Sequence, residues 1–122
     1  MKRTWLALIA AAVLAGGCGG GSSSRLAAGE HDAVEYATAD YRATMTRLGW
    51  PRSATVVTLL VARASCRTAS NLYRVKQVDV VAAAFARRAR ALDRAHEVSS
   101  RAADLRGACS AGIERRGALT SP

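Results

Sequence analysis

The chain has 122 residues and a mass of 12.8 kDa, which is enough for one small domain and too little for two. It carries 18 Lys and Arg residues against 9 Asp and Glu residues, a formal charge of +9, together with 27 alanines and only 2 prolines. This composition favours helices over sheets. Half of the residues are hydrophobic, which excludes global disorder. We therefore expect an all-α fold, a small antiparallel bundle of three to four helices. Two histidines and three cysteines argue against a metal site, and we expect no cofactor.

The first 24 residues have the character of a targeting segment rather than of a folded domain. Lys2 and Arg3 precede an uninterrupted apolar run of 11 residues, 5–15, about half of the ~20 residues that a membrane-spanning helix needs. The run ends in Ala15-Gly16-Gly17-Cys18, and a Gly/Ser tract follows. This segment resembles the signal peptide and lipobox of bacterial lipoproteins, with Ala15 where the box usually has leucine and Leu14 one residue earlier.

The resemblance implies that the thiol of Cys18 is lipidated and that a dedicated signal peptidase cuts before it. Residues 1–17 would be the removed signal peptide, and residues 18–28 would be a lipidated, flexible tether. The protein would then sit on the extracytoplasmic face of a bacterial cell membrane, because two or more acyl chains, such as palmitate, anchor stably. The alternative is an ordinary cleaved secretory signal, which would make the protein secreted and Cys18 incidental.

Two cysteines, Cys66 and Cys109, remain after the targeting segment. An even pair outside the cytoplasm predicts a disulfide, and two cysteines cannot supply the four ligands of a structural zinc site. The alternative is two buried free thiols, which pack as small hydrophobic groups.

Hydrophobic periodicity predicts a first helix from Gly29 to Leu48, ended by Gly49 and Pro51, and a second helix capped by Ser53. We expect the second helix to break at residues 68–71, where Ser70 or Asn71 would cap the next one. The first apolar stripe contains Val34, Ala37, Tyr41, Met45 and Leu48. The second contains Val57, Leu60, Val61, Ala64, Cys66 and Ala69.

The third stretch, residues 72–116, carries two apolar stripes that point in different directions. One contains Val78, Ala82, Phe85, Ala89, Leu92 and His96, and the other contains Val98, Ala102, Leu105, Cys109 and Ile113. A single straight helix would carry Cys109 tens of ångströms from Cys66 at ~1.5 Å per residue, whereas a disulfide needs Cα atoms within ~7 Å. A turn near Ser99 and the disulfide are therefore predicted together, in a helical domain at 29–117 followed by a disordered tail at 118–122. The alternative is one long third helix with unpaired thiols.

The predicted core is thin, because alanine buries little area and large apolar residues are few. They are Leu48, Leu59, Leu60, Leu72, Phe85, Leu92, Leu105 and Ile113. A disulfide would give such a small domain the additional stability that it needs.

Candidate catalytic or metal-binding groups are scarce. His31 and Glu35 lie four residues apart, next to Glu30, and could hold a metal, although a solvated first helical turn is the simpler interpretation. His96 lies on an apolar stripe, which favours a place at the edge of the core over a role as a catalytic base. No serine nucleophile motif or phosphate-binding loop is present in the sequence, so we expect that the protein is not an enzyme.

The excess positive charge is the remaining indication of function. One face of a straight third helix would carry Lys76, Arg87, Arg90, Arg94 and Arg101. Such a face could contact anionic lipid headgroups or cell-wall polymers, or could simply be solvated. We expect a non-catalytic envelope interaction or structural module, whose partners are the membrane through Cys18 and an envelope protein or anionic component, and not a nucleic acid. The alternatives are a ligand-binding lipoprotein with a pocket between helices and, less favoured, an enzyme. The sequence leaves the oligomeric state open.

Overall fold

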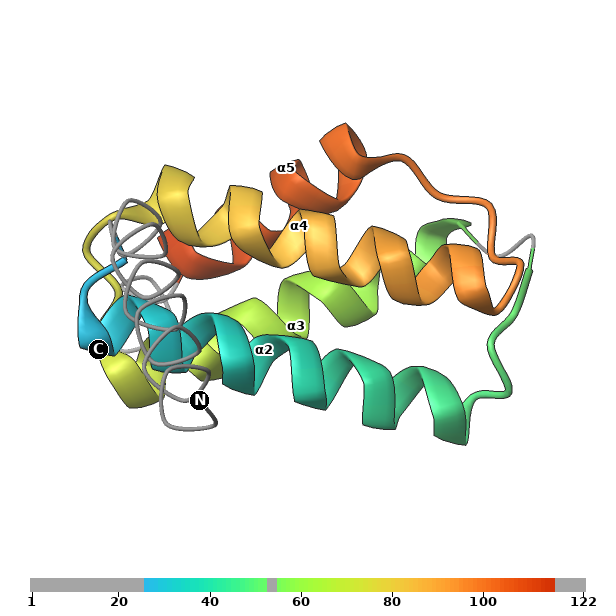
Figure 1. The fold of residues 1–122 in the computed structure, drawn as a ribbon, viewed down its shortest axis with the longest axis horizontal. Helices are drawn as coiled ribbons and strands as arrows, with labels where there is room; N and C mark the ends of the chain where they lie inside the picture. Colours follow the sequence, from blue (N-terminus) through green and yellow to red (C-terminus); the bar gives the residue numbers. More distant parts are fainter. Residues whose placement is uncertain (1–25, 53–54, 116–122) are drawn as a thin grey trace, which may run out of the picture.

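The computed structural model describes residues 26–52 and 55–115, which form four helices that alternate in direction (Figure 1). These are α2 (Ala28–Arg47), α3 (Thr55–Tyr73), α4 (Val78–Ala95) and α5 (Ala102–Glu114). No described residue lies in a strand. The all-α bundle is therefore confirmed, and so is the break in the third stretch, because residues 96–101 separate α4 from α5.

The four helices form a ring. Helix α3 packs against α2 and α5, and α4 packs against the same two helices, so that α3 and α4 lie across the bundle from each other. The α2–α3 and α4–α5 loops meet at one end, at the right of Figure 1, which we call the loop end. The described chain enters at Leu26 at the other end, beside the α3–α4 loop, and we call this the entry end.

Helices α2 and α4 both end in a residue with left-handed backbone geometry. Gly49 has the expected positive φ of 79° after α2. After α4 the same position is occupied by Glu97, with a φ of 59°, and the N–H of Val98 donates to the carbonyl of Asp93 at 2.7 Å. The left-handed geometry costs a residue other than glycine about 1–2 kcal/mol. The turn near Ser99 therefore forms where it was predicted, but without a glycine to mark it.

The predicted break at 68–71 is wrong. Helix α3 continues through Ser70 and Asn71 to Tyr73, and α4 begins only at Val78, six residues after the expected start at Leu72. Ser70 is fully buried inside α3 and does not lie at the start of a helix. The predicted cap of α3, Ser53, lies outside the described residues.

The start of α4 is fixed by a residue of another helix. The carboxylate of Glu30 in α2 accepts hydrogen bonds from the backbone N–H groups of Lys76 (2.9 Å) and Gln77 (3.2 Å). N–H groups at a helix N-terminus have no hydrogen-bond partner within the helix, and the helix dipole also favours negative charge there. The two backbone bonds and Lys76 lower the pKa of Glu30, while partial burial opposes them. Glu30 is buried and engaged in this cap, which differs from the solvated first turn that we expected.

The core confirms the predicted stripes of α2, α4 and α5 more closely than that of α3. Four of the five predicted α2 residues are fully buried, but Leu48 is 51% exposed. In α3 the buried face is shifted toward small residues, and the predicted Leu60 is 48% exposed. Leu72, expected in the core, is 58% exposed. The buried α3 residues are Thr58, Ala62, Ser65, Cys66, Ala69 and Ser70. Small side chains let neighbouring helices approach closely, which leaves the larger leucines at the rim.

Candidate functional site

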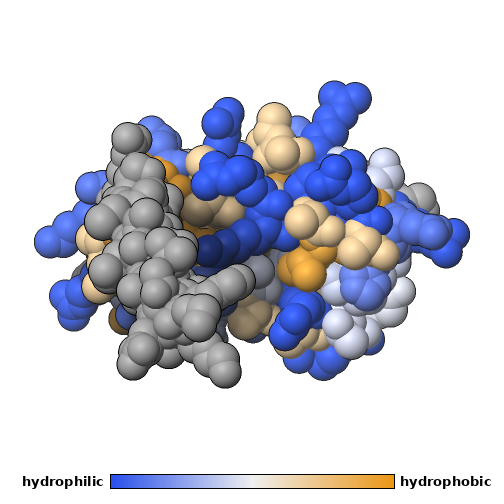
Figure 2. All heavy atoms as spheres, in the orientation of Figure 1, coloured by the Kyte–Doolittle hydropathy of each residue, from blue (hydrophilic) through white to orange (hydrophobic). Residues whose placement is uncertain are grey.

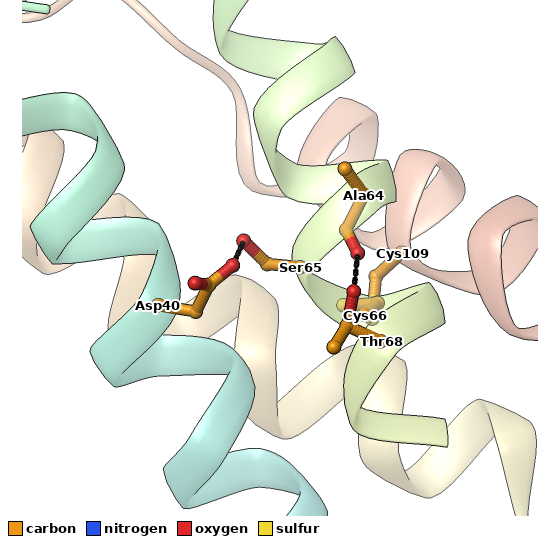
Figure 3. The surroundings of a disulfide bond; sticks show 6 residues. All are labelled: Asp40, Ala64, Ser65, Cys66, Thr68 and Cys109. Atoms are coloured by element: carbon orange, nitrogen blue, oxygen red, sulfur yellow. Dashed lines mark hydrogen bonds between the residues drawn. A yellow bond between two sulfur atoms is a disulfide. The ribbon is translucent and has the colours of Figure 1, made fainter. Parts of the chain in front are cut away.

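A disulfide joins α3 to α5. Cys66 and Cys109 are 43 residues apart, are both buried, and have Cα atoms 5.2 Å apart (Figure 3). On its other side α3 is tied to α2, because the hydroxyl of Ser65 donates to Asp40 at 2.7 Å. The structure thus brings the predicted cysteine pair together, whereas Cys18, the predicted lipidation site, lies outside the described residues.

The two loops of the loop end are joined by an aromatic stack. The ring of Trp50, from the α2–α3 loop, lies 3.8 Å from the ring of His96 and nearly parallel to it. Trp50 also meets the ring of Tyr41 edge-on, and Tyr41 in turn meets Phe85 edge-on. Trp50 therefore covers the end of the core, and His96 lies exposed on its outer side.

Polar contacts reinforce this junction. The guanidinium of Arg52 lies 3.2 Å from the carboxylate of Glu97, and both side chains are exposed. The backbone N–H of Ser99 donates to the carbonyl of Arg52 at 3.2 Å. Three different contacts thus hold the α2–α3 loop against the α4–α5 loop, which makes the loop end a defined surface rather than two independent loops.

A buried acid lies directly beneath this surface. Asp93 and Tyr41 are fully buried, and the Tyr41 hydroxyl donates to Asp93 Oδ1 at 2.7 Å. Burial raises the pKa of Asp93, while the hydroxyls of Ser100 and Tyr41 and the charges of Arg90 and His96 oppose this rise. Burial and the hydrogen bond to Asp93 also raise the pKa of Tyr41. No substrate can reach Asp93 unless the loop end opens, so the pair is placed to organise the core beneath the surface.

The residues considered for a metal site do not converge. His31 Nε2 lies 3.7 Å from Glu35, but Glu35 pairs with Arg88 of α4, and Glu30 points to the start of α4. The Arg88 guanidinium holds the pKa of Glu35 below its usual range. Within the part of the chain that the structure describes, no group of three His, Cys, Asp or Glu residues could hold a metal ion.

The predicted basic face is not a single face. It required a straight helix, but of its five predicted residues α4 carries only Arg87, Arg90 and Arg94. The turn after α4 places Arg101 at the N-cap of α5, which begins beside the middle of α4 (Figure 1), and Lys76 lies in the α3–α4 loop at the entry end.

Positive charge is instead distributed unequally between the two ends of the bundle. The loop end with the α4–α5 loop, residues 42–52 and 90–101, carries six basic residues and two acidic ones within the described part. The basic residues are Arg42, Arg47, Arg52, Arg90, Arg94 and Arg101. Among the described residues, the entry end, residues 26–35, 67–82 and 110–115, carries four basic residues and five acidic ones, and Arg25 and Arg116 adjoin these ranges in the sequence. The sequence alone did not reveal this polarity, because it depends on which segments the four helices bring together.

The described surface is hollowed in several grooves. One, of about 440 Å³, lies between α2 and α4, with Thr38, Ala39 and Leu92 along it and Arg42 and Arg88 at its rim. Another, of about 390 Å³, lies between α3 and α5 and is lined mostly by apolar and small residues. On the face drawn in Figure 2, hydrophilic side chains dominate the described surface, and apolar side chains form small separate spots.

No helix among the described residues is both long enough and apolar enough to cross a bilayer. Comparisons with protein-family models, curated proteins and solved structures gave no match.

Proposed function

We propose that the protein is an exported, lipid-anchored lipoprotein of a bacterial envelope, acting as a non-catalytic interaction or structural module. The observation that carries the proposal is the disulfide between Cys66 and Cys109, because structural disulfides persist in oxidising compartments outside the cytoplasm. The lipobox-like sequence that ends at Cys18 independently supports export and supplies an anchor.

The anchor would set the orientation of the bundle. Eight residues, 18–25, separate the start of the described chain from the proposed lipidated end. A flexible tether of that length has a root-mean-square span of about 16 Å and reaches at most about 28 Å. Because the chain enters at the entry end, this end would lie near the bilayer. The loop end would lie about 30 Å further out, the length of a 20-residue helix such as α2.

An interaction role fits the chemistry of the loop end better than catalysis does. Its acid, Asp93, is fully buried, and its arginines are attached to a surface that the Trp50–His96 stack holds in place. A second candidate is the binding of a small amphiphile between α2 and α4. The volume of that groove, about 440 Å³, falls in the range of small-molecule sites, and Arg42 in its lining would suit an anionic headgroup, whereas Arg88 is already paired with Glu35.

The test is the intact mass of the membrane-extracted protein, measured with and without reductant and thiol alkylation. The proposal expects a chain that begins at Cys18, carries lipid and takes up two alkyl groups only after reduction. A Cys18→Ser variant is the matched control and should lose the lipid mass while retaining the disulfide. A lipid-free mass in the parent protein, or two thiols alkylated without reductant, would contradict the proposal.

A further inference from the structure

We infer that the loop end is a docking surface for an anionic envelope polymer, a flexible chain with repeated phosphate or carboxylate groups. The inference rests on the proposed function, because the anchor decides which end of the bundle faces outward. It is carried by the polarity of charge between the two ends and by the fixed geometry of the loop end.

The arginines of this surface are available for a partner. Among the described residues, Arg52 forms an ion pair with Glu97, but no carboxylate lies within 4 Å of Arg47, Arg94 or Arg101. All three of these side chains are exposed. The guanidinium is a planar donor whose paired N–H groups match both phosphate and carboxylate, and it remains charged at every physiological pH.

The arrangement of these arginines favours a chain over a bilayer. Arg47 and Arg94 come from the last turns of α2 and α4 at the loop end, and Arg101, the N-cap of α5, lies further back on the side of the bundle (Figure 1). The bilayer to which the protein is tethered would be nearer the entry end, where basic and acidic residues are present in similar numbers. At physiological salt, charges interact strongly over only about 8 Å, so headgroups some 30 Å away would attract the loop end little in an upright bundle. A flexible polyanion outside the membrane would reach both the arginines at the loop end and Arg101 on the side of the bundle.

The fold beneath the arginines is suited to hold them in place. The stack of Trp50 on His96 and the hydrogen bond from Ser99 to Arg52 join the two loops that carry or flank the arginines. Tyr41 and Asp93 pack directly below this junction. The polymer would therefore meet an arrangement of charges that needs little reordering, which lowers the entropic cost of binding.

The test uses the lipidated protein from envelope membranes, reconstituted in nanodiscs of neutral phosphatidylcholine. Binding of inorganic polyphosphate and of polygalacturonate is measured at several salt concentrations. In a second arm, the same nanodiscs are mixed with vesicles of phosphatidylglycerol and phosphatidylcholine. The polymers should bind, with an affinity that falls steeply as salt rises, and the vesicles should not compete.

Two triple variants locate the surface. Arg47→Gln, Arg94→Gln and Arg101→Gln together should weaken polymer binding by about tenfold or more. A matched control at the entry end removes the same charge through Arg74→Gln, Lys76→Gln and Arg115→Gln, and should weaken binding less than about threefold. Far-ultraviolet circular dichroism confirms that both variants are folded.

Equal losses in the two triple variants would overturn the inference, as would an absence of polymer binding near physiological salt. Strong binding of the anionic vesicles through the loop-end arginines would assign the surface to a bilayer instead, and would also overturn it. These outcomes are independent of the mass measurement, so a tethered protein that fails to bind the polymers would refute this inference and leave the proposed function standing.

Discussion

Helix α5 approaches α3 closely at Gly112, and replacing this residue with alanine should destabilise the fold. A Cβ atom at Gly112 would lie 2.2 Å from the carbonyl oxygen of Arg63 in α3 and 3.2 Å from its Cγ. The helices would have to separate by about 1 Å to restore an ordinary contact. The disulfide limits that separation, because Cys66 follows Arg63 by three residues and Cys109 precedes Gly112 by three.

The magnitude follows from two opposing effects. Alanine is favoured over glycine inside a helix by about 0.5–1 kcal/mol. Forcing extra atoms into a close-packed interface typically costs about 1–3 kcal/mol, and the fixed bridge one turn away puts Gly112 toward the upper part of that range. We expect Gly112→Ala to lower the free energy of unfolding by about 1–2 kcal/mol.

Gly107 provides a matched control in the same helix. A Cβ at Gly107 would meet nothing within 4 Å, so Gly107→Ala should gain the helix preference alone, about 0.5–1 kcal/mol. Urea unfolding of the oxidised protein, followed by circular dichroism, should separate the two variants by about 2–3 kcal/mol. The reasoning would be refuted if Gly112→Ala were as stable as Gly107→Ala, because the close approach of α3 and α5 would then carry no cost.

Other substitutions test the remaining features of the bundle. Replacing both Cys66 and Cys109 with alanine should cost up to about 4 kcal/mol of stability, because the bridge closes a long loop, and a loss below about 1 kcal/mol in denaturant unfolding would contradict this role. Since the pKa of Glu30 is lowered in the fold, its charge contributes stability above the ordinary carboxylate range, and this stability is lost as pH falls. Glu30→Gln should therefore reduce the slope with which thermal stability falls at acid pH. An unchanged slope would count against the α4 cap. Since the pKa of Asp93 is raised, its charged form opposes folding, and the fold loses stability as pH rises through that pKa. Asp93→Asn should remove this loss of stability toward high pH. A variant with a lower melting temperature at every pH would show that the charge itself is needed. Glu97→Gly should raise stability by about 0.5–1 kcal/mol by relieving the left-handed geometry after α4, whereas a loss in the same melting assay would mean that the exposed ion pair of Glu97 matters more.

The sequence was most informative where large apolar residues recur with helical spacing. The stripes through Tyr41, Phe85 and Leu105 each locate a buried helix face, and the change of face after His96 locates a turn that has no glycine or proline. The disulfide prediction strengthened that of the turn, because Cys109 could not otherwise reach Cys66.

The sequence was least informative in α3, where the buried face consists of alanine, serine and threonine. A hydrophobicity pattern cannot distinguish a buried Ser65 from an exposed one, so it assigned Leu60 to the core instead. The late start of α4 was equally hidden, because its cap, Glu30, is 46 residues away from Lys76 in the chain. Long-range capping of this kind leaves no local signal.

The interface of small residues and the charged loop end both bear on how the fold is stabilised. A core made largely of alanine supplies little hydrophobic stabilisation, so the fold depends on fixed links: the Cys66–Cys109 bridge, the Ser65–Asp40 hydrogen bond and the Glu30 cap. The bridge and the Ser65–Asp40 hydrogen bond lie near the middle of α3, and the Glu30 cap lies at the entry end, so none of these links is in the loops of the loop end. The loop end has its own junction in the Trp50–His96 stack. Its arginines can therefore be replaced with little loss of stability, which allows binding by the arginine surface to be measured separately from folding.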